Sequence, residues 1–316
     1  MREYTVSENE EGITLLKYSS RVLKEAPNGL LYKFLRNKNI ELNGKKADSR
    51  AVLKAGDRVA FFLSDETFIK LHGFVEGKPD RGSNASSPVS LEKSRIIYED
   101  EDYLFYDKPA GLRTQGDGSG RLSLNDLLLD YTGYDKGSVC RPSVCNRLDT
   151  NTSGIVLCGK SVKGLQTLNQ AIRERRIRKY YRAVLKGRAE GGRLVSFISA
   201  EGDDNKVKVS DTARSGYKEI IMELKVISRS DEVTYAELYL VTGRKHQIRA
   251  QMAHAGHPVA GDRKYGIRDD RDKGAGRQLL HSYRTELPED ILDGMTVYAP
   301  VPDDIAGYLK KEGIKA

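Results

Sequence analysis

A single carboxylate stands among small and polar residues in the stretch CNRLDTNTSGIVLC, residues 145–158. Asp149 follows Arg147 by two positions and precedes an apolar, β-branched run that is typical of a buried strand. A carboxylate at the mouth of such a strand can act as a nucleophile or accept a proton. It can also close the strand as an Asx turn, which is the commoner use of a lone Asp before Thr and Ser. This segment alone leaves both interpretations open.

Two further polar segments lie between strand or helix patterns: RKYYRAVLKG at residues 178–187 and TGRKHQIRAQMAHAGHPVAGDRKYG at residues 242–266. Taken singly, Tyr181 could be a core aromatic, and Arg244 and Arg249 could be surface cations. Taken with Asp149, they supply a carboxylate, a flat ring and guanidinium groups.

Other kinds of reaction centre have no counterpart in the sequence. It has no G-x-x-x-x-G-K-[ST] loop, no H-E-x-x-H helix and no G-x-S-x-G elbow. The Gly-rich stretch GDGSGR at residues 116–121 lacks the strand-to-helix setting of a dinucleotide site, so we expect a loop. Its three cysteines form no C-x2-C pair. The sequence therefore predicts chemistry by side chains alone, without metal or cofactor.

Composition points to a globular protein with a polyanionic partner. The 316 residues are 38% hydrophobic and 31% charged, and the net charge is +8. A net positive charge favours nucleic acid as the partner. Charge alone is equally consistent with a basic protein that binds no nucleic acid. No apolar run reaches the length of a membrane span, and the N-terminus is too polar for a secretory signal. With an odd number of cysteines, we expect reduced thiols, a cytoplasmic location and no membrane contact.

A shift in composition divides the chain. Residues 75–94 are rich in Gly, Pro, Ser and charge, which predicts a flexible linker. We therefore expect a small α+β unit at residues 1–74 and a larger unit at residues 95–316.

In the small unit, amphipathic patterns predict a helix around Leu15–Leu23 and another from Asn28, acting as its N-cap. An Asn-Gly turn at residues 43–44 predicts a hairpin of two strands, and a buried strand follows within residues 53–63. The helix and hairpin faces are cationic, with Arg36, Lys38 and Lys45 among the exposed candidates. This pattern resembles the S4 RNA-binding domain, whereas the plainer interpretation is a solvated charged surface.

The larger unit has more strands than helices. Strands are predicted within residues 96–112 and 153–160, at Tyr180–Leu185, and as a pair at residues 217–228 and 233–243. Helices are predicted after Ser123 and Ser161 as N-caps, and from the Thr-Gly-Arg turn to Gly256. Because the strands often adjoin one another, we expect an α+β fold with a mixed, mainly antiparallel sheet flanked by helices and loops.

Together the polar blocks resemble the RluA-type pseudouridine synthases, which isomerise uridine in ribosomal and transfer RNA. NRLDTNTSGIVL is similar to the family's H-R-L-D-x-x-T-S-G-L block, and KYYRAVLKG to its K-x-Y-x-A-x-V-x-G segment. TGRKHQIRAQMAHAGHPVAGDRKYG is similar to the family's third block almost throughout. The resemblance spans roughly residues 96–300 and implies the pseudouridine synthase fold.

The resemblance also implies roles for single residues. Asp149 is expected as the catalytic aspartate, Tyr181 as the tyrosine near the base, and Arg249 as the cation paired with the aspartate. The expected RNA contacts are Arg147, Arg244, His246, Gln247, Lys179 and Lys108, with Arg36, Lys38 and Lys45 in the front unit. The sequence departs from the family pattern at Asn146 and Gln251, where a His is usual, and at Asp107, where an Asn is usual.

The reaction so implied breaks the N–C glycosidic bond, turns the base and joins it through C5, with nothing added. It requires an ionised Asp, which a guanidinium supports against the effect of burial. Whether Asp149 attacks the sugar or takes a proton from it stays open. The expected partner is structured RNA, first large-subunit ribosomal RNA and otherwise transfer RNA, and the expected state is a monomer. Two rival hypotheses are a non-catalytic RNA-binding or ribosome-assembly protein and a hydrolase that cleaves small nucleosides.

Overall fold

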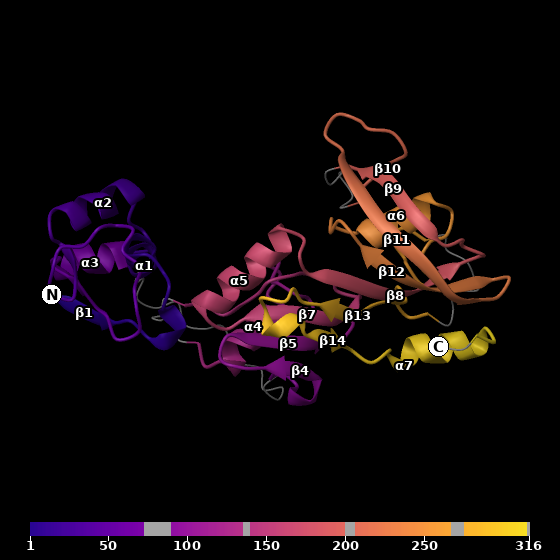
Figure 1. Cartoon of the computed structure of the whole chain (residues 1–316), viewed down its shortest axis with the longest axis horizontal. Helices are drawn as coiled ribbons and strands as arrows, with labels where there is room; N and C mark the ends of the chain where they lie inside the picture. The colour runs from indigo at the N-terminus through magenta and orange to yellow at the C-terminus, as the bar shows by residue number, and fades with distance from the viewer. Residues whose placement is uncertain (73–89, 135–139, 200–205, 267–274, 315–316) are drawn as a thin grey trace.

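The structure of the chain is a computed structural model that describes residues 1–72, 90–134, 140–199, 206–266 and 275–314. The first of these ranges has its own antiparallel sheet, ordered β1-β3-β2, from β1 (Arg2–Thr5), β3 (Arg58–Phe61) and β2 (Ile40–Leu42). Helices α1 (Leu15–Val22), α2 (Asn28–Arg36) and α3 (Asp65–His72) pack around a core that includes Leu15, Leu31 and Phe61. Figure 1 shows this unit at one end of the molecule.

Two details of this unit differ from the sequence prediction. Pro27, not Asn28, is the N-cap of α2, and Asn28 is its first residue. The Asn-Gly turn forms with positive φ at Asn43 and Gly44, as a two-residue hairpin turn requires. The second strand of that hairpin is reduced to one bridge between Leu42 and Lys45, because the polar residues that follow offer no apolar face to bury.

The linker expected at residues 75–94 lies mostly outside the described residues. The division of the chain at residues 74 and 95 stays a prediction. Within the described ranges, the first unit contacts the rest of the chain, because Cys140 and Val162 belong to the same buried cluster as Leu15 and Leu31.

The larger part of the chain forms one mixed sheet, with the path β10-β9-β11-β12-β8-β13-β7-β5-β4, and with β14 paired to β13 and β6 to β7. Among the described pairs, β13 and β7 are parallel and the others are antiparallel. This confirms the expected α+β fold and mainly antiparallel sheet. The strands are β4 (Ile96–Glu99), β5 (Tyr103–Lys108), β6 (Ser143–Val144), β7 (Ser153–Gly159), β8 (Arg178–Lys186), β9 (Gly192–Ile198), β10 (Val209–Ser210), β11 (Lys218–Arg229), β12 (Val233–Leu240), β13 (Leu280–Glu286) and β14 (Thr296–Tyr298).

In the part of the chain that the structure describes, four α-helices accompany this sheet: α4 (Leu124–Tyr131), α5 (Val162–Arg173), α6 (Gln247–His254) and α7 (Asp303–Lys311). Ser123 and Ser161 cap α4 and α5 as predicted, each accepting a bond from a backbone N–H in the first turn. Helix α6 stops before Gly256, whose φ of 84° suits glycine. Figure 1 shows α5 and α6 over different parts of the sheet, with the long strand β8 passing between them.

The sheet is held by an apolar core. Strands β5, β7, β8 and β12 contribute Leu104, Val156, Ala183 and Leu238, all fully buried. Adjacent residues of a strand point to opposite faces, so Tyr181 and Ala183 share one face of β8 while Tyr180 lies on the other. Among the described residues, no helix is long and apolar enough to span a bilayer.

Candidate active site

Asp149 lies in the loop between β6 and β7, and the loop is fixed by bonds to its backbone. The hydroxyl of Thr114 donates to the carbonyl of Leu148 at 2.7 Å and accepts from the Leu148 amide at 3.1 Å. The amide of Gly111 donates to the carbonyl of Thr150 at 2.9 Å. The two neighbours of Asp149 in the chain, Leu148 and Thr150, therefore both have backbones fixed by hydrogen bonds.

Asn146, one of the three departures from the family pattern, serves this loop. Its side chain is buried, its Oδ1 accepts from the Leu157 amide at 2.7 Å, and its Nδ2 donates to the Ile155 carbonyl at 3.5 Å. Both partners belong to β7. The amide side chain thus joins the loop to the strand that follows it. Gln251, the second departure, is buried and donates to the Leu194 carbonyl at 3.3 Å, away from Asp149.

The loop also depends on a close approach between two strands. Gly154, the second residue of β7, has a φ of 113°, and a Cβ there would lie 2.2 Å from the carbonyl oxygen of Ser282 on β13. Any side chain would therefore force the parallel pair β7–β13 apart. Arg277, just before β13, donates to the Asn151 carbonyl and to the Ser153 hydroxyl, each at 3.1 Å. Sequence reasoning did not identify Arg277.

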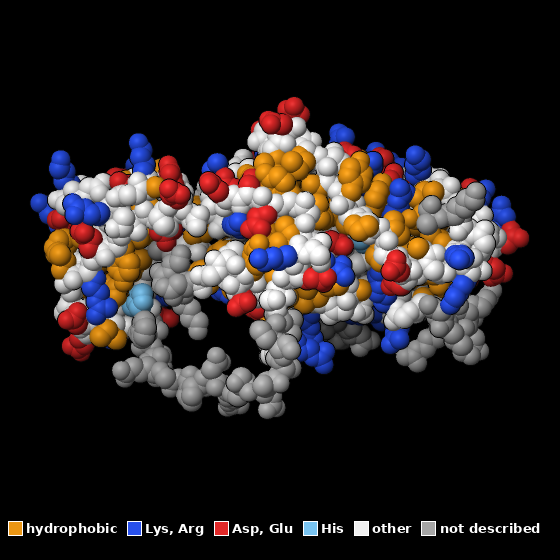
Figure 2. All heavy atoms as spheres, turned by 90° about the horizontal axis from the view of Figure 1, so that it is seen from below, with side chains coloured by type: hydrophobic (Ala, Val, Ile, Leu, Met, Phe, Trp, Pro, Cys, Tyr) orange, Lys and Arg blue, Asp and Glu red, His pale blue; other side chains and the backbone are white. Residues whose placement is uncertain are grey.

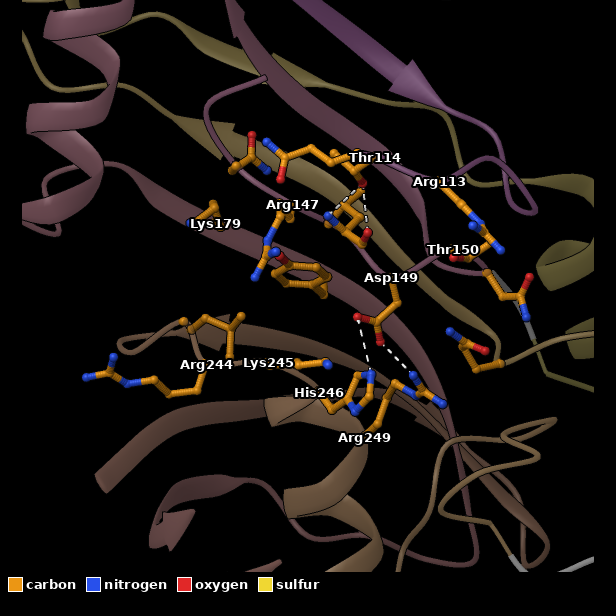
Figure 3. Close-up of a pocket in the computed structure, with 18 of the residues that line it drawn as sticks. Arg113, Thr114, Arg147, Asp149, Thr150, Lys179, Arg244, Lys245, His246 and Arg249 are labelled. Atoms are coloured by element: carbon orange, nitrogen blue, oxygen red, sulfur yellow. Dashed lines mark hydrogen bonds and ion pairs between the residues drawn. The ribbon is translucent and has the colours of Figure 1, made fainter. Parts of the chain in front are cut away.

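Arg249 of α6 joins two carboxylates. Its Nη1 donates to Oδ2 of Asp149 at 2.6 Å. Its Nε and Nη2 donate to Oδ2 and Oδ1 of Asp262, at 2.6 and 2.8 Å. The side chains of Arg249 and Asp262 are 8% and 0% exposed, whereas that of Asp149 is 26% exposed. Arg249 and Asp262 are thus buried, whereas Asp149 is open to the cleft. Figure 3 shows Asp149 and Arg249 with the bond between them.

Arg249 contacts Asp149, as expected, but the contact is a single bond. Asp262 takes the bidentate position and leaves Asp149 a single bond. Asp262 can do so because it follows the turn at Gly261, and it also accepts from the amides of Lys264 and Tyr265. Burial opposes its ionisation, but the bonds from Arg249 hold the pKa of Asp262 below its usual value. The block GDRKYG contained Asp262, yet nothing in its spacing identified the partner.

His246 stands immediately before α6 with left-handed backbone angles, φ 56° and ψ 13°. Its Nε2 lies 3.9 Å from Oδ1 of Asp149, and its Nδ1 lies 2.9 Å from the hydroxyl of Tyr265. Burial lowers the pKa of His246. The carboxylate of Asp149 acts to raise this pKa, whereas the nearby cations Arg249, Lys264 and Lys245 lower it further. The ring is therefore neutral around pH 7.

Tyr181 lies on β8 and lines the same cleft as Asp149 and His246. Its side chain is buried, and burial raises the pKa of its phenol to about 12. A phenol of that pKa is a poor base at neutral pH. Its ring offers an apolar surface, and its hydroxyl can donate or accept a hydrogen bond.

The cleft around Asp149 has a volume of about 680 Å³. Its lining includes two carboxylates, those of Asp117 and Asp149, and seven cations: Arg113, Arg147, Lys179, Arg244, Lys245, Arg249 and Lys264. On the face in Figure 2, by contrast, Lys and Arg side chains are interspersed with Asp and Glu. The excess of positive charge in the cleft suits a polyanion. Within the described ranges, no group of three or more His, Cys, Asp or Glu residues could hold a metal ion.

Several cleft cations lack a counter-ion. Arg147 and Arg244 are exposed, Lys179 is half-buried, and none of the three forms an ion pair with the described residues. Burial lowers the pKa of Lys179. Figure 3 shows Arg147 and Arg244 on the opposite side of Asp149 from Arg113.

Of the other residues expected to contact RNA, two are buried within the fold and three lie outside the cleft. Lys108 is fully buried, and its Nζ donates to three carbonyls, those of Pro109, Leu112 and Thr150. Gln247 is also buried, and its amide bonds Thr242, the Arg244 backbone and the Ile221 carbonyl. The expectation of direct RNA contact is therefore corrected for both, because their polar atoms are already used inside the fold. Arg36, Lys38 and Lys45 are exposed on the first unit and do not line the cleft.

Comparison with known proteins agrees with this fold. Residues 102–254 match the family model described as RNA pseudouridylate synthase. A ribosomal large subunit pseudouridine synthase C of Pasteurella multocida is 30% identical over 90% of this chain and 86% of its own length. One from Rickettsia felis is 30% identical over 80% and 81%. An uncharacterized RNA pseudouridine synthase of Bacillus subtilis is 27% identical over 96% and 94%.

Solved structures show the same fold. Human RNA pseudouridylate synthase domain containing 4 superposes with a TM-score of 0.58 at 20% identity, covering 71% of this chain and 94% of that one. Human RNA pseudouridylate synthase domain containing 1 gives a TM-score of 0.52 at 26% identity, over 66% and 82%. The chain therefore belongs to the RNA pseudouridine synthases of the RluA type and is an isomerase that acts on RNA.

Proposed function

We propose that this enzyme converts specific uridines of structured RNA, foremost large-subunit ribosomal RNA, to pseudouridine with Asp149 as its catalytic residue and without a cofactor. The observation that carries the proposal is the bond between Asp149 and Arg249 in a cationic cleft beside Tyr181. The names of the relatives from Pasteurella multocida and Rickettsia felis support the ribosomal target.

Asp149 has the properties that the first chemical step requires. Arg249 donates a hydrogen bond to it, and since Arg249 is itself held by Asp262, the carboxylate meets a fixed donor. One oxygen is bound by Arg249, and the other faces His246 across 3.9 Å. That second oxygen is available to the sugar of the target nucleotide. It either attacks C1′ of the ribose or removes a ribose proton, and both routes release the base.

Tyr181 then positions the freed base. Its ring offers the uracil a flat partner during the turn that brings C5 to the sugar. The high pKa of the phenol argues against Tyr181 as the base that removes the C5 proton at pH 7. Asp149, which lines the same part of the cleft, can accept that proton.

The target nucleotide must leave its stack before it reaches Asp149. Extrusion costs a few kcal/mol and is cheapest in a loop or mismatch. Arg147 follows the anchored Asn146 directly and is exposed at the cleft, so it can occupy the space that the base leaves. Arg244 and Lys179 line the cleft, and we propose that they meet phosphates of the RNA. These contacts offset the cost of extrusion.

The first unit extends the RNA surface. We propose that residues 1–74 form an S4-like RNA-binding domain, with Arg36, Lys38 and Lys45 as phosphate contacts. All three are exposed in the described structure. A cytoplasmic monomer agrees with this function, and in the described structure Cys140, Cys145 and Cys158 form no disulfide with one another.

The reaction is tested with RNA that carries tritium at uridine C5. Ribosomal RNA transcribed in vitro with this label is incubated with the protein, and tritium release is followed. The RNA is then digested to nucleosides, and pseudouridine is separated from uridine by chromatography. Release of tritium with one pseudouridine formed per tritium is the expected result. Tight binding without release would favour a non-catalytic RNA-binding protein, and free uracil would favour a hydrolase. Sequencing of pseudouridine in cells that lack the gene then identifies the position.

A further inference from the structure

Tyr265 determines how His246 presents its ring to Asp149. The Tyr265 oxygen accepts a hydrogen bond from the Val207 amide at 3.0 Å. The hydroxyl proton is then free to donate, and Nδ1 of His246 lies 2.9 Å away. An Nδ1 that accepts this proton cannot carry one in the neutral ring. The proton of the neutral imidazole is therefore on Nε2.

Nε2 of His246 points to the reacting carboxylate. It lies 3.9 Å from Oδ1 of Asp149, which is too far for a direct hydrogen bond. One hydroxyl oxygen placed between them can donate to Oδ1 and accept from Nε2–H at ordinary distances. Arg249 already binds the other oxygen of Asp149, so Oδ1 is the side that a substrate meets.

The backbone of His246 has a second, plainer explanation. His is among the residues that tolerate a left-handed conformation, and His246 has a φ of 56°. The residue type could reflect that conformation alone. Asn tolerates it at least as well as His. Asn therefore separates the two explanations.

We propose that His246 contacts the substrate through Nε2–H, which donates to the ribose 2′-hydroxyl of the target uridine while that hydroxyl donates to Asp149, and that Tyr265 is the positioning residue that fixes this tautomer. The 2′-hydroxyl is the ribose hydroxyl on the carbon next to the glycosidic bond. The inference rests on the proposed function of Asp149. Tyr265 was not identified from the sequence.

The kinetic test compares His246→Asn with His246→Gln on the tritium-labelled ribosomal RNA. The amide nitrogen of Gln can reach the position of Nε2, whereas that of Asn cannot. We expect His246→Asn to lower kcat/KM about tenfold, the effect of a lost neutral hydrogen bond. His246→Gln should retain several-fold more activity than the Asn variant. The exposed residue His254 supplies the control His254→Asn, which should match wild type.

Tyr265→Phe tests the positioning role. It should lower kcat several-fold on its own but have no further effect in a His246→Asn background, because it acts through that ring. The exposed Tyr298 provides the matched control Tyr298→Phe. Nitrogen-15 NMR of the imidazole gives a readout that a merely structural role would not change. The wild-type spectrum should show His246 protonated at Nε2, and Tyr265→Phe should shift protonation towards Nδ1.

The ribose contact is tested with two short RNA hairpins that contain the mapped target, one with uridine and one with 2′-deoxyuridine there. Each is used as an unlabelled competitor of tritium release. His246→Asn should weaken inhibition by the uridine hairpin about tenfold and leave inhibition by the deoxy hairpin nearly unchanged.

Four results would overturn the inference: full activity of His246→Asn, no advantage of Gln over Asn, wild-type protonation at Nδ1, or equal weakening with both hairpins. Absence of tritium release by the wild-type enzyme would instead overturn the proposed function. The NMR result does not depend on activity, so the two failures are distinguishable.

Discussion

The guanidinium of Arg249 lies 2.6 Å from the carboxylate of Asp149, although 100 positions separate the two residues in the chain. Arg249 is also the partner of the fully buried Asp262. One cation thus serves a structural carboxylate on its inner side and a reactive carboxylate on its outer side. This arrangement changes what substitutions of Arg249 are expected to do.

Arg249→Ala should both inactivate and destabilise the enzyme. It leaves the carboxylate of Asp262 buried without its main partner, and breaking such a pair costs about 3–5 kcal/mol. Urea unfolding measures the free energy of unfolding of this variant and of the double variant Arg249→Ala/Asp262→Asn, and the two values are compared. The double variant should regain part of the lost stability and none of the lost tritium release. Equal stability of the two variants would contradict the buried role of Asp262.

Arg244→Met should weaken RNA binding in a salt-dependent way. Arg244 is exposed at the cleft and has no ion pair among the described residues, so its expected partner is a phosphate. Losing one phosphate contact lowers the slope of log Kd against log salt by about 0.7–0.9. Filter binding at several salt concentrations measures it. Arg188→Met is the control, because Arg188 already pairs with Asp231 at the surface. An unchanged slope for Arg244→Met would exclude the contact.

Charge reversal in the first unit tests its RNA-binding role. The triple variant Arg36→Glu/Lys38→Glu/Lys45→Glu should raise KM for ribosomal RNA at least about tenfold, since each lost phosphate contact weakens binding. Its kcat should stay near wild type, because none of the three residues lines the cleft. Substitution is preferable to deletion here, because the core of this unit includes Cys140 and Val162. A KM equal to wild type would show that this surface does not bind the RNA.

His281 should make stability depend on pH. It is fully buried, with Nδ1 2.9 Å from the Ser153 hydroxyl, and burial lowers its pKa to about 4. Because the unfolded chain binds a proton near pH 6.5, the contribution of His281 is complete above that pH and is lost as the pH falls towards 4. We expect a loss of about 2 kcal/mol from this group between pH 7.5 and 5.

The comparison with His281→Gln isolates that contribution. Urea unfolding of both proteins across this pH range removes what the other titrating groups have in common. The Gln variant should show a shallower decline of stability towards pH 5. Parallel profiles would contradict a buried neutral His281.

The sequence predicted those elements whose signals are local. Ser123 and Ser161 cap their helices, and the adjacent runs at residues 217–228 and 233–243 pair as β11 and β12. β1 was not predicted, because the adjacent polar residues Arg2 and Glu3 obscure the alternation of polar and apolar residues that is typical of a strand. Its partner β3 is also distant in the sequence. Helix α3 was missed although Phe68 and Leu71, three positions apart, are both buried.

The site was only partly readable. The resemblance indicated Asp149, Tyr181 and Arg249, but burial decides whether a polar residue faces substrate or core, and the order of residues does not reveal burial. Lys108 was expected to contact RNA, but its Nζ donates to backbone carbonyls inside the fold, including that of Thr150. Asp262 and Tyr265 were not identified from the sequence. They contact Arg249 and His246 across a turn, and the spacing of residues along the chain does not predict such contacts.

The central claim is that Asp149 carries out the chemistry, and single-turnover tritium release by Asp149→Asn tests it most directly. Asn keeps the shape of the side chain and removes its charge, so filter binding of the same RNA should give a Kd within about threefold of wild type, a small change in free energy. The account predicts that this variant binds RNA and releases no tritium above background. Release at a rate near that of wild type would contradict it.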